Sequence, residues 1–162
     1  SSNPTQKIKV EETQKQTNKS GWQYANWGMT AEQIVEASHG KARAVFGEEQ
    51  RNKSNPYYFD CLAVSDFKTG PFEFDVSFRA KLNETTLNSV YLSLRNTNQY
   101  EELKDSLASK YGQGVTSIKG KQITTSWQTK SEVIELVDIR DALRFVSLTY
   151  SKRVYGPRGL DL

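Results

Sequence analysis

Reactive side chains are scarce in this sequence, which contains one cysteine, Cys61, and one histidine, His39. A single cysteine excludes a disulfide within the chain and a zinc site built from several of its thiolates. Most acid–base and nucleophilic sites need a histidine that a partner orients. His39 instead stands beside Gly40 at the end of an expected helix, where the helix dipole favours a cation. The sequence therefore predicts no catalytic site, no metal site and no cofactor.

Long apolar runs and concentrated charge are also absent. No apolar stretch approaches the roughly 20 residues that a helix needs to span a bilayer. The formal net charge is only +3, and basic and acidic residues are interleaved along the chain. A nucleic-acid binder usually concentrates its basic residues in one stripe, because each phosphate contact needs a cation. We therefore expect neither a transmembrane segment nor a nucleic-acid partner.

Aromatic residues are plentiful by contrast, with 3 Trp, 8 Tyr and 7 Phe in 162 residues, enough for one core. None lies in residues 1–20, which also hold only two isolated aliphatic residues. Such a segment predicts a flexible tail, suited to tethering a domain to a membrane anchor or a signal-cleavage site. The start without a methionine is typical of a processed terminus or of a sequence trimmed for cloning. We expect one domain over residues 21–153 and a C-terminal tail over residues 154–162.

The first of two predicted helices has a strong start signal. Thr30 and Gln33 have the spacing of a capping box, in which each side chain bonds the backbone N–H of the other residue. This predicts a helix over about residues 31–39, and Gly40 is a natural left-handed stop. The polar and charged residues 47–56 predict a loop.

The second predicted helix begins at a similar signal, with Asn98 as the cap and Glu101 three residues later. Apolar residues then recur at intervals of three and four and form one stripe. The stripe consists of Tyr100, Leu103, Leu107 and Tyr111. Gly112 ends this helix.

Three strands are predicted after each helix. They cover residues 57–64, 72–79, 87–95, 121–127, 132–139 and 143–150. The strand over 72–79 alternates apolar and polar residues, which is typical of a half-buried strand. Short connections favour antiparallel neighbours. The sequence therefore predicts an α+β fold of order α-βββ-α-βββ, a two-layer sandwich whose mainly antiparallel sheet of about six strands has both helices on one face.

The uncovered face of that sheet is the first candidate site. It would carry the polar residues that alternate with core residues on the second and third strands. They are Glu73, Asp75, Arg79, Tyr91 and Arg95. We expect this face to bind another protein. A paired-acid hydrolase site at Glu73 and Asp75 is a weaker alternative, because arginine or lysine partners account for both carboxylates equally well.

A second candidate site is a pocket between the helices and the sheet. The aromatic residues Tyr100, Tyr111 and Trp127 are placed to line it. Such a pocket would make the domain a carrier of a small ligand. Core packing is the alternative role for the same side chains.

A resemblance to known proteins comes from the segment Trp27–Gln33, which reads WGMTAEQ. It resembles the W-G-M-[ST]-x-E-[EQ] helix start of small secreted bacterial domains, often of unknown function. The repeated helix-then-strands order is also similar to folds of the β-lactamase-inhibitor-protein type and of small outer-membrane assembly lipoproteins. The resemblance implies a periplasmic or extracellular location, with the signal peptide removed, and protein binding through an exposed sheet or loops. We therefore expect a non-enzymatic bacterial cell-envelope domain.

Overall fold

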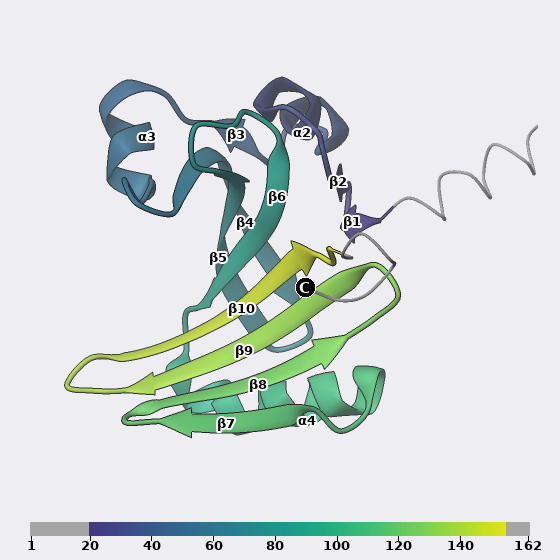
Figure 1. Cartoon of the computed structure of the whole chain (residues 1–162), viewed down its shortest axis with the longest axis vertical. Coiled ribbons are helices and arrows are strands. Elements are labelled where there is room, and N and C mark those ends of the chain that lie inside the picture. The colour runs from purple at the N-terminus through teal and green to yellow at the C-terminus, as the bar shows by residue number, and fades with distance from the viewer. Residues whose placement is uncertain (1–19, 155–162) are drawn as a thin grey trace, which may run out of the picture.

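Eight strands form one antiparallel sheet in the computed structural model, which describes residues 20–154 (Figure 1). In spatial order they are β3 (Arg43–Ala44), β4 (Phe59–Thr69), β5 (Phe72–Lys81), β6 (Leu87–Leu94), β10 (Arg144–Lys152), β9 (Glu132–Arg140), β8 (Gln122–Gln128) and β7 (Val115–Lys119). A separate short ladder joins β1 (Gly21–Trp22) to β2 (Ala25–Asn26). The tails expected over residues 1–20 and 154–162 lie outside the described residues, apart from Ser20 and Val154.

The α+β class and the large antiparallel sheet are confirmed, but the expected count of six strands is wrong. Strand β3 has only two residues, too few to give a pattern. Strand β7 has five residues and all of them are exposed, so it lacks the alternation that marks a half-buried strand. Both extra strands lie at the edges of the sheet, where one side of the backbone has no neighbouring strand.

Residues 20–154 also contain three α-helices rather than the expected two. They are α2 (Ala31–Ala37), α3 (Gly47–Lys53) and α4 (Tyr100–Tyr111), and a 3-10 turn, η1 (Thr97–Gln99), precedes α4. Helix α3 lies within residues predicted as a loop, because no residue of it is buried and no apolar stripe marks it. Hydrogen bonds to β4 hold it instead. Gln50 Nε2 donates to the carbonyl oxygen of Cys61 at 3.0 Å, and the Cys61 amide donates to Ser54 Oγ at 2.8 Å.

The two predicted capping boxes have different outcomes. The first is confirmed, since the Gln33 amide donates to Thr30 Oγ1 at 3.3 Å and the Thr30 amide donates to Gln33 Oε1 at 3.0 Å. The second is wrong, because the capping side chain belongs to Asn96. Its Oδ1 accepts from the Asn98 amide at 3.1 Å and opens η1, and α4 then begins without a side-chain cap.

The core lies on one face of the sheet. Alternation along β5 is confirmed, with buried Phe74, Val76 and Phe78 on this face and exposed or half-buried residues between them. Ile34 of α2 and Leu107 of α4 belong to the same apolar cluster, so α2 and α4 cover the same face of the sheet. In Figure 1, α2 and α3 lie at one end of the molecule and α4 at the other.

The seam of the sheet is the ladder between β6 and β10, which joins strands far apart in the sequence. Its register runs from Ser93 opposite Ser147 to Ser89 opposite Ser151. Strand β10 is thereby inserted between β6 and β9, so that the β4–β6 strands and the β7–β9 strands meet across it. The open face of this seam is the centre of the candidate site.

Candidate binding surface

The five residues predicted to bind a partner lie on the face of the sheet opposite the core. Those on β5 and β6 occupy the odd-numbered positions that alternate with buried residues. The structure divides them into two groups. Glu73, Asp75 and Arg95 form one charged group, and Arg79 and Tyr91 form another.

The first group is an acidic cluster around the Arg95 guanidinium. Nη2 of Arg95 lies 2.7 Å from Asp66 Oδ1 and 2.9 Å from Asp75 Oδ1, and Nη1 lies 3.5 Å from Glu73 Oε2. The Lys68 ammonium is 3.6 Å from Glu73. The hydrogen bond to Asp75 is the main cause that raises the pKa of Arg95. Three carboxylates against two cations leave the acidic cluster with one net negative charge.

Exposure makes the acidic cluster a poor source of stability. The side chains of Asp66 and Asp75 are 81% and 65% exposed. Exposed ion pairs contribute little, because water and salt screen them. The cluster is therefore free to exchange its contacts for those of a partner. Ion pairing with Arg95 also accounts for the proximity of the Glu73 and Asp75 carboxylates, so a paired-acid catalytic site is not needed to explain it.

The second group is the Arg79 sandwich, in which the Arg79 guanidinium lies between two aromatic rings. Its central carbon is 3.7 Å from the centroid of the Phe59 ring and 3.9 Å from that of Tyr91. Burial lowers the pKa of Arg79, although an arginine stays charged in proteins. Its Nε atom is buried and has no hydrogen-bond partner among residues 20–154. No carboxylate of that range forms an ion pair with it.

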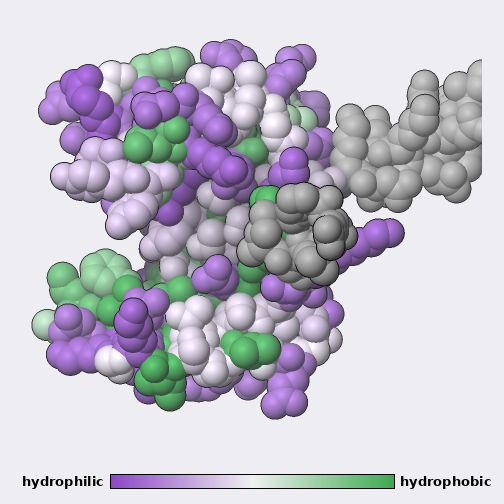
Figure 2. Space-filling model, viewed as in Figure 1, coloured by the Kyte–Doolittle hydropathy of each residue, from purple (hydrophilic) through white to green (hydrophobic). Residues whose placement is uncertain are grey.

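The acidic cluster and the Arg79 sandwich lie along the same strand with small hydroxyl residues around them. Asp75 and Arg79 are four positions apart on β5, which corresponds to about 13 Å. Ser93 lies opposite Asp75, and Ser147 continues the row on β10. In Figure 1, α4 lies behind β8 and β7, so the view is onto the open face. Figure 2 shows pale side chains in a hollow between the lobe with α3 and the lobe with the β9–β10 turn.

Three members of these groups were not predicted from the sequence, namely Phe59, Asp66 and Lys68. A bulge in β4 between Cys61 and Ala63 shifts the register, so Phe59 shares the open face with Arg79 while Ala63 is in the core. No alternation rule locates such a bulge. Asp66 lies beyond the predicted strand end at residue 64, although β4 continues to Thr69.

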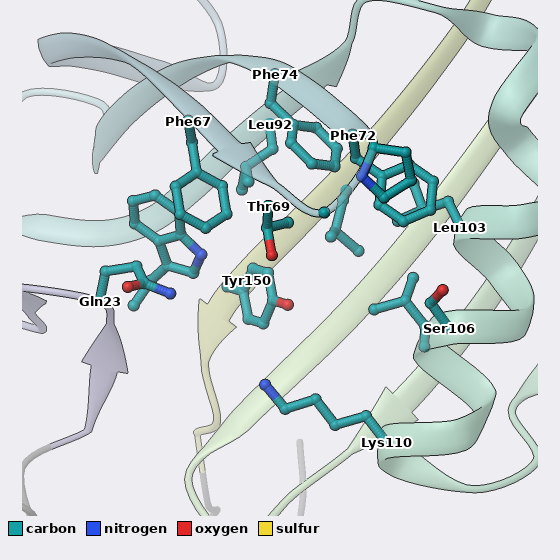
Figure 3. Close-up of a pocket in the computed structure, with 15 residues that line it drawn as sticks. Gln23, Phe67, Thr69, Phe72, Phe74, Leu92, Leu103, Ser106, Lys110 and Tyr150 are labelled. Atoms are coloured by element: carbon teal, nitrogen blue, oxygen red, sulfur yellow. The ribbon is translucent and has the colours of Figure 1, made fainter.

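The predicted pocket residues Tyr100, Tyr111 and Trp127 pack in or against the core rather than around one cavity. The rings of Tyr111 and Trp127 are in contact, with centroids 6.4 Å apart, whereas Tyr100 is at the other end of α4. Tyr100 and Trp127 are 2% and 5% exposed and belong to the core cluster. Trp127 Nε1 donates to the carbonyl oxygen of Gly112 at 2.8 Å. A cavity of about 370 Å³ does exist between α4, β1–β2, the β4–β5 turn and β10 (Figure 3), and none of the three residues lines it.

A buried ion pair lies on the core side of the β9–β10 turn. Asp138 is not an ordinary surface charge of the turn, because its side chain has no exposed surface. Arg140 Nε lies 2.6 Å from Asp138 Oδ2, and Arg144 Nε lies 3.0 Å from Oδ1. Burial would raise the pKa of Asp138, but hydrogen bonds from Arg144 and Arg140 outweigh it and lower that pKa.

No three side chains of metal-binding type cluster within residues 20–154. The helices in that range are too short or too polar to span a bilayer. Comparison of the chain with protein-family models, curated proteins and solved structures gives no match. The resemblance to small secreted bacterial domains therefore stays a prediction.

Proposed function

We propose that this chain is a non-enzymatic protein-binding domain of the bacterial cell envelope, and that it binds its partner through the open face of the sheet. The observation that carries the proposal is the Arg79 sandwich. An arginine fixed between two rings and without a carboxylate partner among the described residues is a preformed binding group for an acidic side chain. Arginine and tyrosine are also enriched among the residues that dominate interface energies.

The physical advantage of the Arg79 sandwich is preorganisation. A free arginine loses rotamer freedom when it pairs with a carboxylate, whereas the Phe59 and Tyr91 rings already hold this guanidinium flat. Stacking on the rings is favourable in itself and leaves the guanidinium edge for hydrogen bonds. A carboxylate of the partner would also offset the burial that lowers the pKa of Arg79.

The acidic cluster supplies the second half of the recognition pattern. Its net negative charge favours a lysine or arginine of the partner, about 13 Å from the carboxylate that meets Arg79. Ser77 stands between the two groups on β5, and Ser93 lies opposite Asp75, so small side chains leave room there for a convex loop. We therefore infer a partner that inserts a loop with an acidic and a basic residue into the hollow of the sheet.

Site-directed photo-crosslinking tests the location of the interface. A photo-crosslinking amino acid at Ser93, on the open face, is compared with one at Ser109, which is exposed on α4. Cross-links to one envelope protein from position 93 and none from position 109 support the proposal. Equal yields from both positions, or cross-links from position 109 alone, contradict it.

Affinity measurements with the cross-linked partner then test the chemistry. Arg79→Gln is expected to weaken binding by about thirtyfold, the ~2 kcal/mol of an interface hot spot. Arg51→Gln is the matched control, since Arg51 is exposed on α3 and lines a separate pocket that contains none of the proposed binding residues. Arg95→Gln is expected to strengthen binding, because it makes the acidic cluster more negative. Equal losses for Arg79→Gln and Arg51→Gln would exclude the Arg79 sandwich from the interface.

The envelope location depends on the sequence resemblance alone and has its own test. Fractionation of the source cells with an antibody to the chain is expected to place the protein outside the cytoplasmic membrane. Recovery in the cytoplasm would remove the location from the proposal and leave the binding surface intact.

A further inference from the structure

The cavity between the two halves of the fold is apolar at one end and polar at the other. Phe74, Leu92 and Leu103, all nearly fully buried, form its apolar end. In Figure 3, Lys110 reaches from α4 toward Tyr150 at the opposite end. The volume of about 370 Å³ lies within the roughly 300–1,000 Å³ of small-molecule sites.

The polar end contains one cation and several neutral hydrogen-bonding groups. Lys110 is exposed, and no carboxylate of residues 20–154 forms an ion pair with it. The Thr69 hydroxyl and the Gln23 amide also line the cavity, and Figure 3 shows the Thr69 hydroxyl directed toward Tyr150. Burial and a hydrogen bond with Tyr111 raise the pKa of Tyr150, so its hydroxyl stays neutral.

The arrangement of walls and charge matches one class of ligand. An extended hydrocarbon chain would cover the apolar walls of the cavity. Water hydrates this end of the cavity poorly, because the walls offer it few hydrogen bonds. A single carboxylate at the other end would meet the Lys110 ammonium and the neighbouring hydroxyl groups. We propose that the cavity binds a monoanionic amphiphile of the fatty-acid type. This site lies on the core face of the sheet and is independent of the proposed protein-binding face.

Calorimetric titration of the full chain with dodecanoate tests the proposal. The expected result is saturable binding of one dodecanoate per chain below the critical micelle concentration, and native mass spectrometry of the same mixture should show the 1:1 complex. 1-Dodecanol has the same chain without the charge and is expected to bind about fivefold more weakly, the upper end of what an exposed ion pair contributes. No binding of dodecanoate, or uptake of many molecules per chain, overturns the proposal.

Variants of α4 separate the cavity from nonspecific adsorption. Lys110→Gln is expected to lower the affinity for dodecanoate to that for 1-dodecanol. Lys104→Gln is the matched control, because Lys104 is on the same helix and does not line the cavity. Ser106→Phe adds a ring at the cavity wall and is expected to abolish binding of both ligands. Equal effects of the two lysine changes, or unchanged binding in Ser106→Phe, would show that the ligand binds elsewhere.

Discussion

Arg144 holds both carboxylate oxygens of Asp138, with Nε 3.0 Å from Oδ1 and Nη2 3.0 Å from Oδ2. Asp138 is on β9 and Arg144 on β10, so this bidentate pair closes the turn between the two strands from the core side. Arg140 adds a third hydrogen bond to the same carboxylate. Both guanidinium groups also lie within 6 Å of the Tyr100 ring, which links the turn to the first residue of α4.

Replacement of Asp138 by asparagine is expected to destabilise the fold by about 2–3 kcal/mol. Loss of one partner of a buried pair costs roughly 3–5 kcal/mol, and the partial exposure of Arg140 and Arg144 reduces that value. Urea unfolding followed by circular dichroism measures the change. Asp141→Asn is the control, because Asp141 pairs with Lys121 in the open, and it is expected to leave the urea midpoint unchanged. A similar midpoint for both variants would show that the pair is not stabilising.

The same carboxylate predicts a loss of stability in acid. Because the pKa of Asp138 is lowered in the folded chain, from an ordinary value of 3.8, its contribution is fully present above that ordinary value. It is lost as the pH falls through the still lower pKa of the folded state. Urea midpoints at pH 5 and pH 3 are expected to differ more for the unchanged chain than for Asp138→Asn. An equal acid loss in the two proteins would assign the effect to other carboxylates.

Cys61 is expected to be inert toward a thiol reagent in the native state. Its side chain is fully buried, and burial is the main cause that raises the pKa of the thiol. The thiolate is the reactive form, so both effects slow the reaction. Reaction with a disulfide reagent such as DTNB should proceed only as fast as the chain opens, and one thiol per chain should react in denaturant. Rapid labelling of the native chain would contradict the buried position.

Two helix caps that look alike in the sequence are expected to differ in energy. Thr30→Ala removes a side chain that accepts from the Gln33 amide, and should cost about 1 kcal/mol. Asn98→Ala should have little effect, since the capping oxygen at the second helix belongs to Asn96. Urea unfolding of both variants measures the difference. A larger loss of stability for Asn98→Ala than for Thr30→Ala would show that Asn98 caps the second helix, as the sequence alone predicts.

The parts of the fold that sequence predicts well are those with local causes. The alternation along β5 follows from burial of one face, and the Thr30 box follows from the spacing of two side chains. Helix α3 and strand β7 are not predicted from the sequence, because they lack such local causes. They have no buried apolar stripe of their own and depend on hydrogen bonds to the neighbouring strand β4 or β8.

The candidate surface shows the same division. Alternation assigns Arg79 and Arg95 to one face, but it cannot distinguish their roles. Pairing across three strands surrounds Arg95 with carboxylates, whereas a bulge in β4 places Phe59 against Arg79. Both outcomes depend on register between strands, which a single sequence does not encode in any local pattern.

The place of β10 in the sheet determines the order in which the fold can be completed. Strand β10 is the last strand of the described chain, yet it stands between β6 and β9. During synthesis, β6 and β9 therefore emerge from the ribosome with unpaired edges that can recruit strands of other molecules. The sheet closes only after β10 is released, so assembly of the seam is expected to follow translation rather than accompany it. A chain truncated before β10 would expose the unpaired edges of β6 and β9 instead of forming one continuous sheet.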